Sequence, residues 1–242
     1  MLRRMARAIT RSSSLAASAK LNAEMALPTA MGQEWCGRRT WSQHGEDEVL
    51  MRELSPWFKN GYYVDVGANH PARLSNTFRL YANGMSGVLV EPTDRLCAMH
   101  LRYRPRDIVL NTAIGPRDGL AKFYELASHQ FSTFSKEDAD MRIAGGIPLT
   151  RIAYKPIFTL RTILSECIPE NREQFALLSV DAEGWDEEIL KSNDWDRFRP
   201  VLTVVEANTS DVDQRIESLM GSAGYARIAT CGVNGIFKDT RR

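Results

Sequence analysis

The sequence predicts an α/β fold with a mostly parallel sheet, helices on both faces and an antiparallel hairpin at the C-terminal end. Short apolar runs alternate with helix-like segments along most of the chain, which is the order of βαβ units. Several of these runs end in an acidic residue, and two final strand-like runs flank Asn234-Gly235, a hairpin turn signal. The pattern is typical of a doubly wound, Rossmann-like sheet, whose ligands bind at the carboxyl ends of the strands.

Length and composition are those of one globular domain. The chain has 242 residues, of which 43% are hydrophobic and 25% charged, with a formal net charge of +1. This charge provides no general attraction for nucleic acid, so no nucleic-acid partner is expected. The cysteines are scattered without a C-x-x-C pair, which argues against a zinc site or a disulfide framework and favours a cytoplasmic location. No apolar run approaches the ~18–20 residues of a transmembrane segment.

Residues 1–40 differ from the rest of the chain. Arg3, Arg4, Arg7 and Arg11 precede the first acid, Glu24, and a stretch rich in serine and alanine follows them. We interpret them as a basic tail or a helical extension, with an organelle transit peptide as the alternative. The predicted catalytic domain is residues 41–242.

The first strand is expected at residues 62–66. It contains an acid, Asp65, and breaks at Gly67, where a glycine lets the backbone turn sharply and approach a ligand closely. The structural alternative is a buried strand in which Asp65 only caps the next element. A helix is expected to precede this strand and to end near Pro56.

The second strand, at residues 87–91, ends in Glu91, the position at which doubly wound sheets bind ribose hydroxyls. The glycines that cradle a pyrophosphate are missing, because Gly67 is followed by Ala68, Asn69 and His70. An adenosine-bearing ligand without pyrophosphate fits this pattern better, and S-adenosylmethionine is the main candidate. A nicotinamide cofactor is the alternative.

The remaining elements follow the same alternation. Further strands are expected at residues 108–115, 175–184 and 200–206, with the closing hairpin at 225–230 and 235–238. Helices are expected around residues 78–82, 96–103, 160–164, 187–190 and 216–220. Residues 127–156 mix polar and aromatic side chains around Gly145-Gly146, and we expect an irregular acceptor lid there.

The ordered set of motifs resembles the FkbM family of S-adenosylmethionine-dependent methyltransferases between about residues 41 and 208. The matching residues are Ser42-Gln43-x-Gly45-Glu46-Asp47, residues 63–68, Pro71, Ser75-Asn76-Thr77, Tyr81, Glu91-Pro92, Asn111-x-Ala113-Ile114-Gly115, Ser132-Thr133-Phe134, Asp181-x-Glu183-Gly184, Arg199-Pro200 and Glu206. One departure is Asp186, where the family more often has glutamate. The resemblance implies the Rossmann-like class I methyltransferase fold and O-methylation of a sugar or polyketide hydroxyl.

The strand ends and the resemblance together indicate the cofactor site. Its expected members are Gln43, Asp65, Gly67, Asn69, Asn76, Glu91, Pro92, Asn111 and Ala113. Glu91 would accept hydrogen bonds from the ribose hydroxyls, Asp65 would contact the ammonium group or the ribose, and residues 111–114 would border the adenine.

Two carboxylates after the fourth strand, Asp181 and Glu183, are the expected catalytic residues, with His70 as a further candidate and His129 as a rival base. An i, i+2 spacing within a strand would place both acids on one face, where, with Glu206, they could bind Mg²⁺ or Mn²⁺. The alternative is that Asp181 caps the next helix and Glu183 faces water.

The expected function is methylation of a hydroxyl on a glycan or glycolipid acceptor. Within the family, the narrowest expectation is the 2-hydroxyl of a fucose on a lipochitooligosaccharide Nod factor. The alternatives are a polyketide or other small-molecule O-methyltransferase and a non-catalytic adenosine-binding scaffold.

Overall fold

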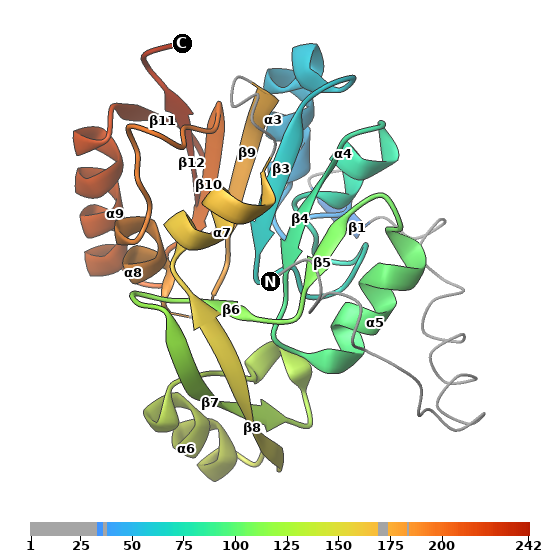
Figure 1. Cartoon of the computed structure of the whole chain (residues 1–242), viewed down its shortest axis with the longest axis vertical. Helices are drawn as coiled ribbons and strands as arrows, with labels where there is room; N and C mark the ends of the chain where they lie inside the picture. The colour runs from blue at the N-terminus through green and yellow to red at the C-terminus, as the bar shows by residue number, and fades with distance from the viewer. Residues whose placement is uncertain (1–32, 36–37, 169–173, 183) are drawn as a thin grey trace.

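A computed structural model describes residues 33–35, 38–168, 174–182 and 184–242. At its centre lies a seven-stranded sheet in the order β11-β12-β10-β9-β3-β4-β5 (Figure 1). Strands β10, β9, β3, β4 and β5 run parallel, whereas β12 pairs antiparallel with both β10 and β11. The strands are β3 (Tyr62–Val66), β4 (Ser86–Val90), β5 (Ile108–Leu110), β9 (Phe175–Val180), β10 (Leu202–Glu206), β11 (Tyr225–Cys231) and β12 (Asn234–Asp239). The predicted architecture, including the C-terminal hairpin, is confirmed.

Helices cover both faces of this sheet, because the central strands place apolar side chains on both faces. Tyr62, Val64 and Val66 of β3 join a core with helices α7, α8 and α9, whereas Tyr63 joins a second core with α3, α4 and α5. The helices are α3 (Glu46–Glu53), α4 (Phe78–Ala82), α5 (Asp94–Tyr103), α7 (Leu160–Cys167), α8 (Asp186–Lys191) and α9 (Ser210–Ser222). Among the described residues, no helix is long and apolar enough to cross a bilayer.

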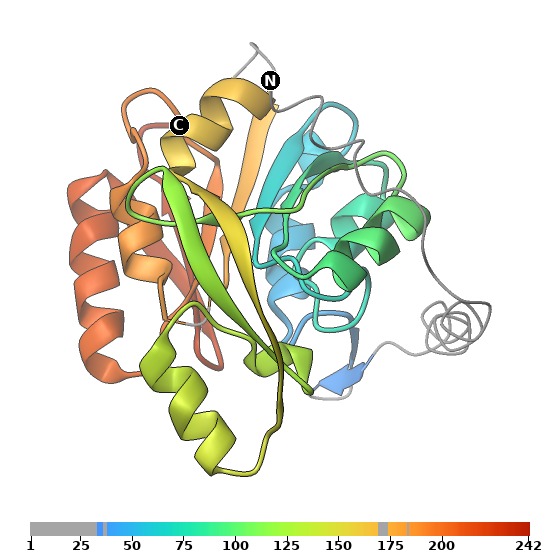
Figure 2. The ribbon, with the colours of Figure 1, turned by 60° about the horizontal axis from the view of Figure 1, so that its bottom comes forward.

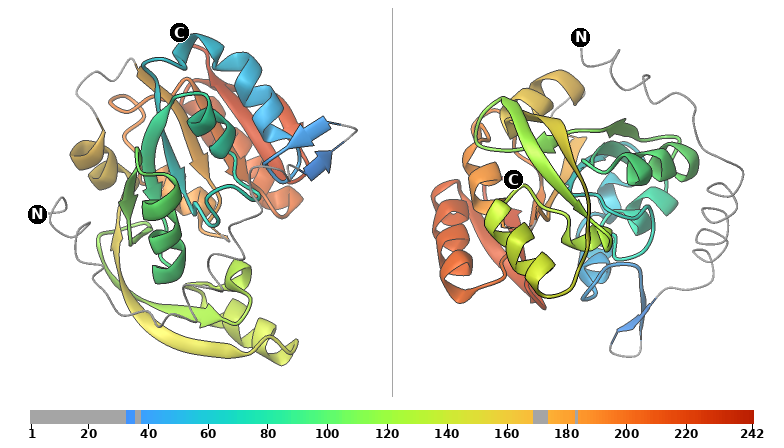
Figure 3. Two further views of the ribbon diagram at one scale, coloured as in Figure 1. Left: turned by 90° about the vertical axis from the view of Figure 1, so that its right-hand side faces the viewer. Right: turned by 90° about the horizontal axis from the view of Figure 1, so that it is seen from below.

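A second, three-stranded sheet extends beyond the carboxyl ends of the parallel strands (Figures 2 and 3). It consists of β6 (Ala113–Ile114), β8 (Leu149–Phe158) and β7 (Gly119–Leu126), with a 3₁₀ turn, His129–Phe131, and helix α6 (Lys136–Ala144) between β7 and β8. We call residues 113–158 the lid.

The lid corrects two predictions. The strand expected at 108–115 is two strands, because β5 pairs with β4 and β6 pairs with β8 in the other sheet. The stretch 127–156, expected to be irregular, is largely regular. Ser135 caps α6 by accepting a hydrogen bond from the Asp138 amide, and β8 pairs with β7 along its length. This pairing joins residues far apart in sequence, so a local pattern did not reveal it.

The predicted N-terminal extension falls mostly on residues 1–32, outside the described residues. Within the remainder, β1 (Gln33–Trp35) and β2 (Arg38–Thr40) form a short antiparallel pair. The boundary at residue 41 stays a prediction.

Candidate functional site

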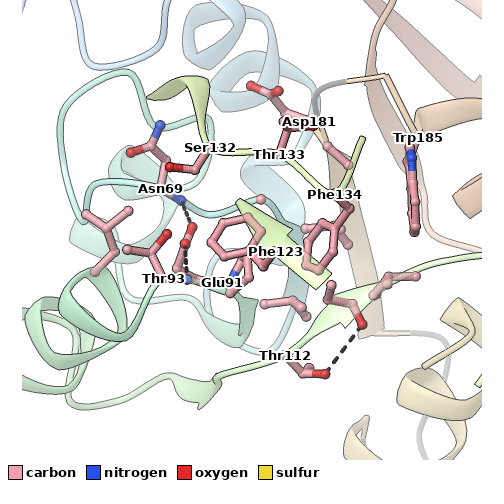
Figure 4. A pocket seen from close by; sticks show the side chains of 18 of the residues that line it. Asn69, Glu91, Thr93, Thr112, Phe123, Ser132, Thr133, Phe134, Asp181 and Trp185 are labelled. Carbon is pink, nitrogen blue, oxygen red and sulfur yellow. Dashed lines mark hydrogen bonds between the residues drawn. The ribbon is translucent and has the colours of Figure 1, made fainter. Parts of the chain in front are cut away.

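The pocket lies where the strand order of the large sheet reverses. From β3 the chain proceeds to β4 and β5 in one direction, whereas β9 and β10 lie on the other side of β3. The loops after β3 and β9 therefore diverge and leave a crevice, which is the usual ligand site of such sheets. The crevice has an empty volume of about 760 Å³, including space open to solvent, and the lid forms its opposite wall (Figure 4).

Gly67 marks the point where the ends of β3 and β9 meet. Its φ is +76°, and a Cβ atom would lie 1.7 Å from the carbonyl oxygen of Asp181. The Asp181 amide donates to the carbonyl of Val66 at 3.0 Å, which holds the two strand ends together. Only glycine satisfies both the left-handed conformation and this close approach.

Glu91 follows β4 and is 4% exposed. One carboxylate oxygen accepts a hydrogen bond from the Asn69 amide at 2.9 Å, and the other accepts one from the Thr93 amide at 2.7 Å (Figure 4). Burial raises the pKa of this carboxyl, and the two amide donors oppose that shift. A carboxylate has about four acceptor positions, so capacity for a ligand's hydroxyl groups remains.

Asn69 lines the same pocket in a left-handed conformation, with φ at +46°. Its side-chain Oδ1 is buried and has no hydrogen-bond partner in the described part of the chain. Buried acceptors are nearly always satisfied, so this atom is suited to accept a hydrogen bond from a ligand.

The opposite wall of the pocket is aromatic. Phe123 of β7 packs against Phe134 with ring centroids 4.7 Å apart, and Phe134 in turn lies 5.5 Å from Trp185 (Figure 4). The hydroxyl-bearing residues Ser132 and Thr133 line the pocket beside them. This wall offers apolar ring faces with a few polar groups, the usual lining of an organic-ligand site.

Asp181 lines the pocket from the loop after β9. The strand ends at Val180, so the expected strand spacing of the two acids does not apply, and Glu183 lies outside the described residues. The predicted capping alternative is wrong, because α8 has Trp185 as its N-cap residue. Asp186 organises this loop by accepting hydrogen bonds from the Ala182 amide at 2.9 Å and the Gly184 amide at 3.1 Å.

Comparison with protein families assigns the chain to a family. The sequence profile described as the methyltransferase FkbM domain matches residues 65–226, which is more than half of the chain. The protein belongs to the FkbM methyltransferase family. Its fold is that of the class I methyltransferases, as the sequence predicts, and the family and fold imply S-adenosylmethionine as the methyl donor.

Solved structures similar to this FkbM methyltransferase are distant. The precorrin-6y C5,15-methyltransferase of Geobacter metallireducens is 12% identical, with 78% of this chain and 85% of that chain covered and a TM-score of 0.43. The TehB-like SAM-dependent methyltransferase of Corynebacterium glutamicum is 11% identical, with 94% and 100% covered and a TM-score of 0.43. No curated protein matches the chain significantly.

The FkbM pocket brings together part of the predicted cofactor and catalytic set. The predicted residues that line it are Gly67, Asn69, Glu91, Pro92, Ala113, Asp181 and the rival base His129. Their chemistry fits S-adenosylmethionine, because its ribose hydroxyls and ammonium group are hydrogen-bond donors, whereas the Glu91 carboxylate and the unsatisfied Asn69 Oδ1 are acceptors.

Asp65 lies beneath the pocket of this FkbM methyltransferase, in a buried polar network. Its carboxylate accepts a hydrogen bond from the Thr77 hydroxyl at 2.5 Å and faces the charge of Arg104. Arg104 is fully buried and donates to Asp107 at 2.7 Å and to the Tyr63 hydroxyl at 2.7 Å. Asp65 is therefore a buried core residue that does not line the pocket, whereas the sequence predicted that it would contact the cofactor.

Other predicted residues also support the pocket from outside. Asn111 donates from its amide to the carbonyls of Glu91 at 3.2 Å and Pro92 at 3.1 Å, which braces the strand end. Asn76 donates to the Ser179 hydroxyl at 3.2 Å between the two strand ends. His70 accepts hydrogen bonds on Nδ1 from the amides that follow it, at 3.1 and 3.0 Å, and thereby shapes a turn.

Two further predicted residues, Gln43 and Glu206, do not line the pocket. Gln43 is exposed, and Glu206 accepts a hydrogen bond from the side-chain amide of Asn208 at 2.8 Å. Within the described residues, no group of three or more His, Cys, Asp or Glu side chains could hold a metal ion. Of the proposed metal ligands, Asp181 alone lines the pocket, and Glu183 is outside the described part.

The sequence analysis did not single out Thr93, Phe123 and Trp185, which line the pocket. Thr93 and Trp185 come directly after the predicted acidic motifs, so their positions in the chain could have indicated them. Phe123 depends on tertiary packing, and no local pattern distinguishes it.

Proposed function

We propose that this protein transfers the methyl group of S-adenosylmethionine to a hydroxyl oxygen of a sugar or glycolipid. The observation that carries the proposal is a single pocket that is lined by hydrogen-bonding groups at the strand ends, by the rings of Phe123, Phe134 and Trp185, and by Asp181. When bound, S-adenosylmethionine supplies an electrophilic methyl group.

The strand-end wall is suited to hold the donor. Glu91 is already oriented by the Asn69 and Thr93 amides, so its carboxylate needs little rearrangement to accept ribose hydroxyls. Pro92 and Ala113, which also line the pocket, would border the adenine ring.

Asp181 is the general base in this proposal, because it lines the pocket and its carboxylate can accept a proton. Its carboxylate would accept the proton of the acceptor hydroxyl in the same step in which that oxygen takes the methyl group and the donor's carbon–sulfur bond breaks to leave a neutral thioether, because an ordinary carboxylate is too weak a base to remove the proton first. His129 also lines the pocket and is the second candidate. His70 is a weaker one, since its Nδ1 accepts from the Ala72 and Arg73 amides.

The lid wall favours a sugar acceptor over a wholly apolar one. Aromatic rings such as Phe134 and Trp185 can pack against the C–H face of a sugar ring, while the Ser132 and Thr133 hydroxyls can hydrogen bond to its polar edge. A fucose 2-hydroxyl on a lipochitooligosaccharide is the narrowest form of this proposal, and a polyketide hydroxyl is the alternative.

The test is calorimetric titration with S-adenosylmethionine, followed by transfer of labelled methyl groups to a panel of fucosides, other glycosides and hydroxylated polyketides. Binding with O-methylation of a glycoside supports the proposal, and product analysis gives the position. Binding without turnover on any acceptor favours the scaffold alternative.

Metal dependence is tested in the same assay. If Mg²⁺ or Mn²⁺ takes part through Asp181 and its neighbours, a chelator will abolish turnover and added metal will restore it. The absence of a nucleic-acid substrate and a cytoplasmic location stay predictions.

A further inference from the structure

The turn at Asn69 is held at both of its backbone groups. Its amide donates to a carboxylate oxygen of Glu91 at 2.9 Å, and its carbonyl lies 2.8 Å from Nε2 of His100. With φ at +46°, the residue adopts a conformation that most side chains avoid and asparagine tolerates. The two hydrogen bonds select this conformation over the more common ones.

His100 lies on the inner face of α5 and is 0% exposed. Because a carbonyl oxygen can only accept, Nε2 must carry the proton, and Nδ1 has no hydrogen-bond partner in the described residues. Burial, with the nearby charge of Arg104 and then His70, lowers the pKa of this imidazole to about 3. The ring is therefore neutral at working pH, in one tautomer.

The contacts form a chain from the helix to the pocket. The His100 ring holds the Asn69 carbonyl, the left-handed turn directs the Asn69 amide to Glu91, and both Asn69 and Glu91 line the pocket. If the carbonyl lost its donor, Asn69 could relax to a right-handed or extended conformation, and Glu91 would lose one of its two amide donors.

We propose that His100 is a positioning residue of the donor pocket, which acts through the Asn69 carbonyl to hold the turn that orients Asn69 and Glu91. The role toward S-adenosylmethionine rests on the proposed function. His100 does not line the pocket and does no chemistry itself.

The first experiment compares His100→Gln with His100→Leu by calorimetric titration with S-adenosylmethionine. Glutamine places an N–H donor near the position of Nε2, so its Kd should stay within about threefold of wild type. Leucine removes the donor and should raise Kd about tenfold, the effect of one hydrogen bond of about 1.4 kcal/mol. KM for S-adenosylmethionine should rise in parallel, while kcat at saturating donor stays within about twofold, as expected for lost donor binding.

The matched control is Met99→Ala, a buried substitution on the same helix at a side chain that carries no hydrogen-bond donor for the Asn69 carbonyl. It should lower thermal stability and leave Kd unchanged. Equal weakening by His100→Leu and Met99→Ala would overturn the proposal, as would Leu and Gln variants that bind equally well.

A ligand-free measurement separates this proposal from the proposed function. Nitrogen-15 NMR of the side chains should show His100 in the Nε2–H tautomer with no titration between pH 5 and 8, and the Asn69 amide resonance should shift in His100→Leu and return in His100→Gln. A protonated ring in that range, the other tautomer, or an unmoved Asn69 resonance would overturn the inference. Failure of the wild-type protein to bind S-adenosylmethionine, with these NMR results intact, would reject the proposed function instead.

Discussion

The two walls of the pocket differ in how they are built. The strand-end wall consists of short loops in which backbone amides and a buried carboxylate hold one another, as in the contacts of Glu91 with Asn69 and Thr93. The lid wall consists of Phe123 on β7 and of Phe134, whose ring also packs against Trp185 at the start of α8, and the lid leaves Leu120 68% and Tyr154 61% exposed. The first wall is polar and is held by hydrogen bonds, whereas the second presents the apolar faces of packed rings.

Under the proposed function, this difference would separate donor binding from acceptor selection. A buried carboxylate must be oriented in advance, because each unpaired polar group in a dry site is costly. Ring contacts are less directional, so the lid can change its side chains without disturbing the strand ends. The lid is joined to the other wall by Lys155, which donates to Asn111 at 3.0 Å and pairs with Asp94.

The largest difference is expected between two glycine-to-alanine variants, one at the strand ends and one in the lid. Gly67→Ala places a Cβ against the Asp181 carbonyl in a left-handed conformation, so we expect a loss of more than about 3 kcal/mol in unfolding free energy and no measurable donor binding. Gly119→Ala in the lid meets no atom within 4 Å and should change stability by less than about 0.5 kcal/mol. Denaturant unfolding and calorimetry check both, and equal effects would contradict the comparison.

Next in size is the loss of the strand-end charge. Glu91→Ala removes an acceptor of charged hydrogen bonds worth about 1.5–3 kcal/mol, so Kd for S-adenosylmethionine should rise about 10- to 100-fold. Unchanged affinity by calorimetry would reject the ribose assignment.

Asp65→Asn is the contrast to Glu91→Ala, since Asp65 lies one residue before the end of β3 and Glu91 directly follows the neighbouring strand β4. Because Asp65 bonds to Thr77 and faces Arg104, its loss should lower the unfolding free energy by about 1–3 kcal/mol and leave donor Kd within about threefold. A large loss of affinity for S-adenosylmethionine with normal stability would show that Asp65 contacts the cofactor after all.

A substitution in the lid wall should weaken binding of the acceptor and leave binding of the donor nearly unchanged. Phe134→Ala removes ring contacts with both Phe123 and Trp185, so we expect KM for the acceptor to rise about tenfold while donor Kd stays within about twofold. Steady-state kinetics with each substrate varied in turn makes the measurement. A parallel loss of donor binding would show that the walls are not independent.

The smallest effect is expected on the lid surface. Arg151 pairs with Glu125 and Asp94 but is half exposed, so Arg151→Gln should cost less than about 0.5 kcal/mol. Thermal unfolding at low and high salt checks it, and a drop of several degrees would mean that these ion pairs hold the lid in place.

The sequence by itself determined the large sheet and part of the pocket lining. Apolar runs, Gly67 and Glu91 are local signals, because strand burial, a left-handed turn and an acid at a strand end each depend on adjacent residues. The parallel order and the closing hairpin followed from such local signals, and the family followed from the resemblance of the ordered motifs.

Only the tertiary structure decided the rest. The pairing of β7 with β8 and the aromatic wall join residues distant in sequence. Asp65 and Glu91 have similar settings in the sequence, yet one faces the buried Arg104 and the other the pocket. His100 has no sequence signal, because its role depends on a carbonyl 31 positions away that the fold brings within 2.8 Å. Hydrogen-bond partners are chosen in three dimensions, and so is the chemical role of each acid.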